Sequence, residues 1–183
     1  MRLVILGGPG AGKSTQGEQL CAYLGIVHIS TGDILRAGIN QGTDLGKQAQ
    51  PYVEKGELVP DNLMIEFMRE RLAQPDVANG WMLDGYPRTA FQAEELDFLL
   101  DELGQHLNWA IWLDVPEDVL IQRSIERSRM DDNPEAIKRR VQIFHEETLP
   151  MLEYYNYRDR LLKVNGHQPV EQVQVDLRQH VKG

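Results

Sequence analysis

The sequence predicts an α/β fold in which a five-stranded parallel sheet is flanked by helices on both faces. Short apolar segments alternate with longer helical patterns along the whole chain, which is typical of parallel strands joined by helical crossovers. A glycine-rich loop follows the first apolar segment and leads directly into a helical pattern. Both observations indicate one domain over residues 1–183, a length that can bury a sizeable core.

The glycine-rich loop is the most specific signal in the chain. Residues 3–6 form a predicted buried strand, and residues 7–14, GGPGAGKS, match the pattern G-x-x-x-x-G-K-[ST]. Glycines let the backbone turn its N–H groups inward to form an anion site, and the next helix points its N-terminal dipole there. Lys13 would bring a cation to the outer phosphates of a nucleotide, and the Ser14 hydroxyl would help to hold Mg²⁺. The alternative is a flexible glycine loop with a coincidental lysine.

The other elements alternate along the chain. We expect further strands at about residues 26–29, 81–84, 109–113 and 161–164, and helices at about 14–24, 34–37, 45–54, 61–72, 89–103, 116–127, 134–155 and 169–181. Pro51 falls inside one predicted helix and is expected to kink it. Because ligands bind at the carboxyl ends of parallel strands, the polar segments that follow the strands should gather along one edge of the sheet.

Composition excludes several function classes. The net charge of -9 argues against non-specific binding to nucleic acid or to anionic membranes. Six of the nineteen lysines and arginines lie between Arg123 and Arg140, which predicts an anionic small ligand there. Cys21 is the only cysteine, so we expect no disulfide and no structural zinc. No apolar run approaches the ~20 residues of a membrane span, and no signal or transit segment is evident, so we expect a cytoplasmic protein.

Six stretches of the chain resemble adenylate kinases, which are nucleoside monophosphate kinases. They are GGPGAGKSTQ (7–16), HISTGDILR (28–36), GELVPD (56–61), LDGYPRT (83–89), RMDDNPEAIKRR (129–140) and LLKVNG (161–166). The resemblance is to the short form, without the long lid insert. It implies a single P-loop kinase domain over residues 1–183, with a mobile AMP-binding segment at about 30–59 and a very short lid at about 126–132.

The resemblance implies reversible transfer of the terminal phosphoryl group from Mg-ATP to AMP, giving two ADP, by a cytoplasmic monomer that balances adenine nucleotides. The residues it implies for ATP are Gly10, Ala11, Gly12, Lys13, Ser14, Thr15, Arg123 and Gln168. Those for AMP are Thr31, Arg36, Glu57, Leu58, Val59, Gly85, Tyr86, Pro87, Arg88, Gln92, Arg129 and Arg140. The catalytic set is Lys13, Arg88, Arg123, Arg127, Arg129 and Arg140, and Ser14 and Asp84 would hold Mg²⁺, Asp84 through water.

These residue types suit phosphoryl transfer. The protein must hold donor and acceptor in line and neutralise charge on the moving group, and arginine does so because its fork stays charged and matches phosphate oxygens. Asp131 and Asp132 are expected to orient these arginines. The Gln92 amide can pair with an adenine edge, but cytosine offers a similar donor and acceptor, so this residue leaves the base open.

Three features depart from the family pattern. The family usually carries Gly-Thr after the loop lysine, where this chain has Ser14-Thr15, and Pro51 lies in the segment that should move over AMP. The very short lid leaves less protein to exclude water, so ATP hydrolysis is a conceivable side reaction. Two alternatives remain. One is a UMP/CMP kinase of the same fold, against which Thr31 and Tyr86 argue, and the other is a nucleotide-binding sensor without turnover.

Overall fold

The computed structural model describes residues 1–127, 129 and 132–181. Its sheet contains five strands in the order β2-β3-β1-β4-β5, and every neighbouring pair is parallel. The strands are β1 (Arg2–Leu6), β2 (Val27–Ser30), β3 (Trp81–Asp84), β4 (Trp109–Asp114) and β5 (Leu161–Asn165). The predicted fold class and sheet are therefore confirmed.

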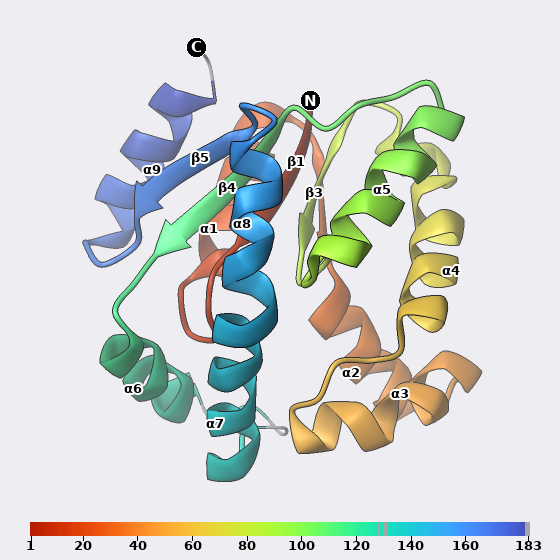
Figure 1. Cartoon of the computed structure of the whole chain (residues 1–183), viewed down its shortest axis with the longest axis vertical. Coiled ribbons are helices and arrows are strands. Elements are labelled where there is room, and N and C mark those ends of the chain that lie inside the picture. The colour runs from red at the N-terminus through yellow and green to blue at the C-terminus, as the bar shows by residue number, and fades with distance from the viewer. Residues whose placement is uncertain (128, 130–131, 182–183) are drawn as a thin grey trace.

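Helices connect the strands and cover both faces of the sheet (Figure 1). In chain order they are α1 (Lys13–Leu24), α2 (Thr31–Gln41), α3 (Asp44–Lys55), α4 (Asp61–Leu72), α5 (Ala90–Glu102), α6 (Glu117–Arg127), α7 (Pro134–Ile143), α8 (Leu149–Asn156) and α9 (Val170–His180). A 3₁₀ turn occupies Pro75–Val77, and a π-helical turn occupies Phe144–Thr148.

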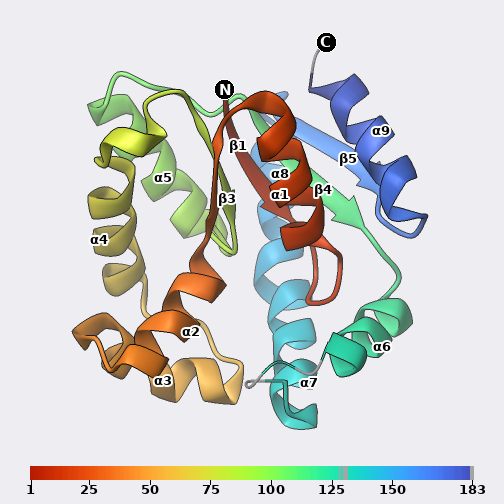
Figure 2. The ribbon, with the colours of Figure 1, turned by 180° about the vertical axis from the view of Figure 1, so that it is seen from behind.

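Successive side chains of β1 enter opposite halves of the core, because side chains alternate across a strand. Leu3 and Ile5 belong to an apolar cluster with residues of α1 and α9. Val4 and Leu6 belong to a second cluster with residues of α4, α5 and α8. The two sides are seen in turn in Figures 1 and 2, with α8 in front of the sheet in the first and α1 in front in the second. The central strand is thus apolar on both faces, as expected for a sheet covered on both sides.

Two predicted helices differ from the structure. The short helix expected at 34–37 begins at Thr31, because Ser30 Oγ caps it by accepting from the Asp33 N–H at 3.3 Å, and it continues to Gln41, where Gly42 in the left-handed conformation ends it. The single helix expected at 134–155 is α7 and α8 joined by the π-helical turn. Pro150 at the start of α8 has no N–H to donate to the carbonyl four residues before it, which is compatible with a wider turn at this place.

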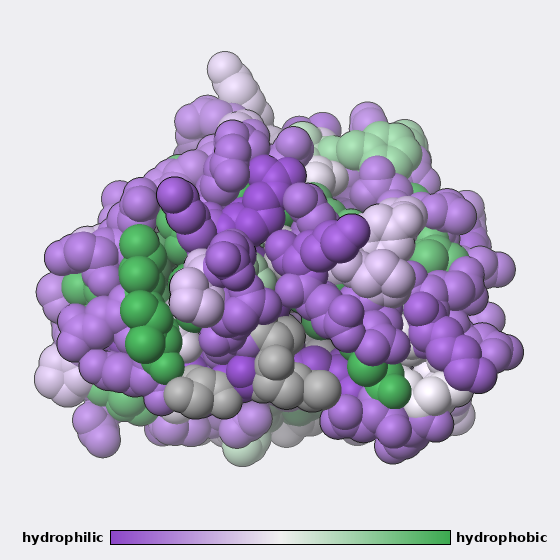
Figure 3. Space-filling model, turned by 90° about the horizontal axis from the view of Figure 1, so that it is seen from below, coloured by the Kyte–Doolittle hydropathy of each residue, from purple (hydrophilic) through white to green (hydrophobic). Residues whose placement is uncertain are grey.

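The carboxyl ends of the strands face two pairs of helices. Helices α2 and α3 lie on one side of this end of the sheet, and α6 and α7 lie on the other (Figures 1 and 2). Seen from this end, the surface is mainly hydrophilic (Figure 3). Within the described residues, no helix is both long enough and apolar enough to cross a membrane.

Candidate active site

A cavity of about 490 Å³ lies at the carboxyl ends of the strands. It is lined by the glycine-rich loop, the start of α2, the segment after α3, the turn after β3, and arginines of α6 and α7. All the residues named above for ATP, AMP, catalysis or Mg²⁺ line this one cavity. The polar segments that follow the strands are therefore brought together at one edge, as the parallel sheet predicts.

Lys13 lies in the glycine-rich loop at the start of α1, with its ammonium group turned toward the loop backbone. Its Nζ donates to the carbonyl oxygens of Gly7 at 2.9 Å and Gly8 at 3.0 Å. Burial lowers the Lys13 pKa to about 8, the Asp84 carboxylate opposes this, and the nearby charges of Arg88 and other arginines lower it further. A group of cations crowded in this way favours an anionic ligand, whose charge would restore the lysine pKa.

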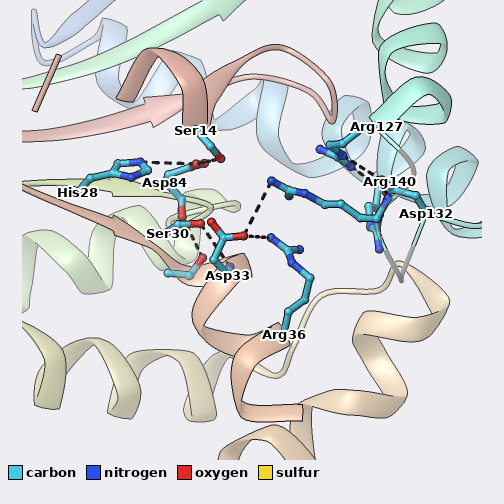
Figure 4. Close-up of polar contacts among 11 residues, drawn as sticks. Ser14, His28, Ser30, Asp33, Arg36, Asp84, Arg127, Asp132 and Arg140 are labelled. Carbon is cyan, nitrogen blue, oxygen red and sulfur yellow. Dashed lines mark hydrogen bonds and ion pairs between the residues drawn. The ribbon is translucent and has the colours of Figure 1, made fainter. Parts of the chain in front are cut away.

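Ser14 and Asp84 meet beside the loop (Figure 4). Ser14 Oγ donates to Asp84 Oδ2 at 2.7 Å, and Asp84 is only 4% exposed at the end of β3. His28 Nε2 lies 3.8 Å from the same carboxylate oxygen. Among the residues that the structure describes, there is no cluster of three or more His, Cys, Asp or Glu side chains able to hold a metal. The hydroxyl and carboxylate oxygens are nevertheless the ligand type that Mg²⁺ prefers.

The turn after β3 contains Gly85, whose backbone other groups can approach closely because it carries no side chain. Gly85 has φ of 93°, and a Cβ there would lie 2.5 Å from Thr31 Oγ1. The buried Thr31 hydroxyl donates to the Asp84 carbonyl oxygen at 3.1 Å, so it already has a partner in the protein. Arg88 Nε donates to the Gly85 carbonyl oxygen at 2.8 Å. These contacts hold the Arg88 guanidinium close to the turn, on the cavity wall.

The Gln92 amide is fixed in one orientation. Thr89 caps α5 by accepting from the Gln92 N–H at 3.1 Å, which places Gln92 one turn into the helix. Gln92 Oε1 accepts from the Arg88 N–H at 2.8 Å, and its Nε2 donates to Asp61 Oδ1 at 2.8 Å. Because the Arg88 N–H can only donate, the amide nitrogen must face Asp61. The link to Asp61 was not predicted from the sequence.

Asp132 gathers the arginines of α6 and α7 (Figure 4). Its fully buried carboxylate accepts from Arg127 Nε at 2.9 Å, from Arg127 Nη2 at 2.8 Å and from Arg140 Nη1 at 2.8 Å. It also accepts from the Arg129 N–H at 3.0 Å. Burial acts to raise the Asp132 pKa, but the hydrogen bonds and the two guanidinium charges outweigh it and lower the pKa. The expected orienting role of Asp131 lies outside the described residues.

Asp33 is a site residue that sequence reasoning missed. It lies between two arginines, pairing with Arg36 on α2 and lying 3.9 Å from Arg129 Nη2. Burial acts to raise the Asp33 pKa, but hydrogen bonds from Arg36 and Ser30 outweigh it and lower the pKa. Burial and the charges of Arg36 and Arg127 lower the pKa of Arg129. The only sequence signal for Asp33 was its place within the HISTGDILR stretch.

Arg123 and Gln168 line one end of the cavity. Arg123 Nη1 donates to the Gly166 carbonyl oxygen at 3.3 Å, and Gln168 Nε2 donates to Asp176 Oδ2 at 2.6 Å. The apolar side chains of Ile143 and Phe144 also line the cavity, and they come from the α7 end and the π-helical turn. No sequence pattern indicated these two residues, because the expected continuous helix carries no sign of the π-helical turn.

The parallel sheet, the glycine-rich loop and the arginine-lined cavity together define a P-loop kinase of the nucleoside monophosphate type. The sequence model of the adenylate kinase family matches residues 5–160. An adenylate kinase 2 of a Nostoc species is 62% identical over 94% of both chains, and an adenylate kinase 2 of a Synechocystis species is 56% identical over 94% of this chain and 96% of the other. An adenylate kinase of Corynebacterium urealyticum is 47% identical over 94% of both chains. This chain belongs to the adenylate kinase family.

Proposed function

We propose that this protein transfers the terminal phosphoryl group reversibly from Mg-ATP to AMP, giving two ADP. The observation that carries the proposal is the convergence of the glycine-rich loop and seven basic side chains on one cavity. These side chains come from both halves of the molecule: Lys13, Arg36, Arg88, Arg123, Arg127, Arg129 and Arg140. So many cations around one cavity suit two phosphorylated ligands better than a single nucleotide.

The donor is assigned to the side of the cavity formed by the glycine-rich loop. The backbone N–H groups and Lys13 would bind the β- and γ-phosphates, at the N-terminus of α1. Arg123 and Gln168 would flank the donor base. The ATP-binding residues in this proposal are Gly10, Ala11, Gly12, Lys13, Ser14, Thr15, Arg123 and Gln168, which line the cavity together.

The acceptor is assigned to the side formed by α2 and the turn after β3. Arg36 and Arg88 would grip the AMP phosphate, which suits the guanidinium fork. Apolar lining at Leu58 and Val59 suits a base. The AMP-binding residues in this proposal are Thr31, Arg36, Glu57, Leu58, Val59, Gly85, Tyr86, Pro87, Arg88, Gln92, Arg129 and Arg140.

The reaction requires positioning and charge neutralisation rather than a protein base. A phosphate oxygen of AMP attacks the γ-phosphorus, the bond to the β,γ-bridging oxygen breaks, and both products leave as ADP. Because the nucleophile is already an anion, no side chain has to remove a proton from it. Arg127, Arg129 and Arg140 would stabilise the transferring group, whose charge spreads over its equatorial oxygens.

Mg²⁺ fits the oxygen ligands of the site. Ser14 and Asp84 would hold the ion beside the phosphates, directly or through water, and the nucleotide and water would complete its coordination. The ion supplies charge neutralisation for the transferred group. We also assign mobile roles to residues at about 30–59 and 126–132, whose closure would expel water, and we expect a cytoplasmic monomer.

The test is ADP formation from Mg-ATP with AMP, CMP, UMP and GMP supplied separately, with a control that lacks an acceptor. Rapid turnover with AMP alone is the expected result. A preference for CMP or UMP would overturn the assigned base and keep the mechanism. No transfer to any acceptor, with ATP still bound, would overturn the kinase assignment in favour of a sensor.

The Arg88→Ala variant separates binding from turnover. It removes one grip on the acceptor phosphate and leaves the donor side intact. We expect ATP binding within about twofold of the wild type and a loss of turnover of at least ~100-fold, because misplacing one reactant costs about that much. Unchanged turnover in this variant would contradict the acceptor assignment.

A further inference from the structure

We propose that Gln16 and Gln174 are positioning residues for the donor nucleotide. They form an oriented chain of amides that ties the loop beside the donor base to the phosphate-binding helix α1. The inference rests on the proposed function, because it places the donor base at the end of the cavity lined by Arg123, Gly166 and Gln168.

Both glutamines are buried and bonded to each other. Gln16 on α1 is 3% exposed, and Gln174 on α9 is 4% exposed. Gln174 Nε2 donates to Gln16 Oε1 at 2.7 Å and to the Gln16 carbonyl oxygen at 2.8 Å. Gln16 Nε2 then donates to the carbonyl oxygen of Val170, the first residue of α9, at 3.1 Å. Three hydrogen bonds thus join α1 to α9. Gln16 and Val170, which share one of them, are 154 residues apart in sequence.

Arg178, a cation at the outer end of the amide chain, fixes the direction of the hydrogen bonds between the two glutamines. Arg178 Nε donates to Gln174 Oε1 at 3.3 Å, and its guanidinium group stacks over the Tyr23 ring of α1 at 4.4 Å. Because a guanidinium group only donates, Gln174 must turn its oxygen toward Arg178 and its nitrogen toward Gln16. Flipping either amide would leave donors facing donors in a buried place, which is unfavourable. The two glutamine amides therefore have one stable hydrogen-bonded orientation.

This arrangement sets the distance between the two ends of the donor site. Gln16 lies three residues after Lys13, and Val170 lies two residues after Gln168. Gln16, Gln168 and Val170 all line the cavity. Asp176 on α9 also accepts from Gln168 Nε2 at 2.6 Å, so α9 holds the loop at a second point. Loosening the amide chain should let the base loop shift relative to the phosphates, which affects ATP and leaves the AMP side unchanged.

The test is Gln174→Met, which keeps the length of the side chain and removes its donors. The measured quantities are the Kd for a non-hydrolysable Mg-ATP analogue, the Kd for AMP, and the melting temperature. We expect the Kd for the analogue to rise about five- to tenfold, in line with the loss of one or two hydrogen bonds, and the Kd for AMP to change less than twofold. The matched control is Gln74→Met, because Gln74 is exposed and its amide donates to the Glu70 carbonyl oxygen within its own neighbourhood in sequence.

A second variant guards against simple misfolding. Gln174→Glu keeps an acceptor for Arg178 but has no N–H to donate to Gln16, so it should also weaken binding of the ATP analogue selectively. A lower melting temperature with unchanged affinity for the analogue in both variants would show a purely structural role and overturn the proposal. An equal loss of affinity for the ATP analogue and for AMP would overturn the proposal as well. If the wild type binds both nucleotides and transfers nothing, the proposed function fails while the binding data still decide the role of the amide chain. A wild type that does not bind the analogue would overturn both.

Discussion

The Ser14 hydroxyl, directly after the loop lysine, donates a hydrogen bond to the Asp84 carboxylate at 2.7 Å. In the general P-loop pattern a hydroxyl at this place binds the nucleotide-bound metal. In the proposed function, Ser14 would therefore offer Mg²⁺ an oxygen ligand in addition to Asp84. The hydrogen bond keeps both groups pointing to the same place before any nucleotide arrives, which favours metal binding without rearrangement.

Removing the Ser14 hydroxyl should change the metal requirement. For Ser14→Ala we expect the Mg²⁺ concentration that gives half of the maximal rate to rise about five- to tenfold, since a ligand oxygen is lost. Ser14→Thr keeps the hydroxyl and serves as the control. A Mg²⁺ titration of the initial rate at fixed ATP decides the matter, and coinciding curves for wild type and Ser14→Ala would remove Ser14 from the metal site.

The lowered pKa of Lys13 predicts a pH dependence of donor binding. Its cation is lost as the pH rises through about 8, so the affinity of the free enzyme for Mg-ATP should fall above that pH. The Kd for a non-hydrolysable analogue, measured between pH 6.5 and 9.5, should show this loss, with the Kd for AMP as the comparison. Lys13→Arg, which stays charged throughout, should bind more weakly but without this transition. A flat wild-type profile would contradict the lowered pKa.

The lowered pKa of Lys13 has the opposite effect on the free energy of unfolding. Between about pH 8 and 10.5 the unfolded chain binds more protons at Lys13 than the folded chain does. Its contribution to the free energy of unfolding therefore increases with pH through that window. Donor binding and this contribution to stability should thus move in opposite directions, which separates the lysine from a general loss of structure at high pH.

At the scale of residues, sequence reasoning succeeded where a motif fixes the spacing. The glycine-rich loop, the turn at Gly85 and the arginines after Arg123 could be placed along the chain because each follows a strand or shares a helix face. The Gln16–Gln174 chain was not predictable, because it joins residues far apart in sequence whose pairing depends on how α1 meets α9. The orientation of Gln92 likewise depends on Asp61, which lies on another helix.

At the scale of elements, helices α2 and α3 cross at a pair of glycines. A Cβ added at Gly46 would lie 2.2 Å from the carbonyl carbon and oxygen of Gly38. The two helices can approach this closely because Gly46 carries no side chain, whereas a Cβ at Gly38 would lie 3.5 Å from the Gly46 Cα, in ordinary contact. Sequence reasoning placed α3 correctly but ended α2 too early, and it did not predict this packing contact between glycines. Pro51, which it expected to kink α3, lies inside a helix assigned without a break from Asp44 to Lys55.

Gly46→Ala should separate α2 from α3. We expect a lower melting temperature and a KM for AMP raised about tenfold or more, because Arg36 and Thr31 on α2 would move, while the KM for ATP stays within about twofold. Overpacking of this kind typically destabilises by about 1–3 kcal/mol. Gln48→Ala, an exposed substitution in the same helix, is the matched control. Steady-state kinetics with each substrate varied in turn would expose the difference, and equal effects of the two variants would refute the packing role.

The connection between α6 and α7 depends on Asp132. Asp132→Ala would remove the buried acceptor that Arg127 and Arg140 share, although Arg140 Nη2 would still donate to the Val53 carbonyl oxygen at 3.3 Å. We expect kcat to fall by at least ~100-fold, with a much smaller change in the affinity for AMP. Asp132→Asn keeps one acceptor oxygen, so its kcat should lie between the values for the wild type and for Asp132→Ala. Retention of wild-type kcat in Asp132→Ala would show that the arginines find their positions without it.

At the scale of the whole molecule, the two sides of the cavity touch each other directly. Glu57 pairs with Arg139 on α7 through two hydrogen bonds, Nε to Oε1 at 2.8 Å and Nη2 to Oε2 at 3.0 Å. Asn133 Nδ2 donates to the Glu54 carbonyl oxygen at 3.4 Å. The segment proposed to close over AMP is thus in contact with the helix that carries Arg140. Such partly exposed contacts are individually weak, so they can break and form again as nucleotides enter and leave.

The contact between the two sides of the cavity bears on the proposed reaction, in which a phosphoryl group passes directly from ATP to AMP and not to water. The most direct measurement uses ATP labelled in its γ-phosphate, incubated with Mg²⁺ and the protein, with and without AMP. We predict that the label is recovered in the β-phosphate of ADP when AMP is present, and that little inorganic phosphate is released in either case. Release of the label as inorganic phosphate, at a similar rate with and without AMP, would contradict it and show that water is the acceptor.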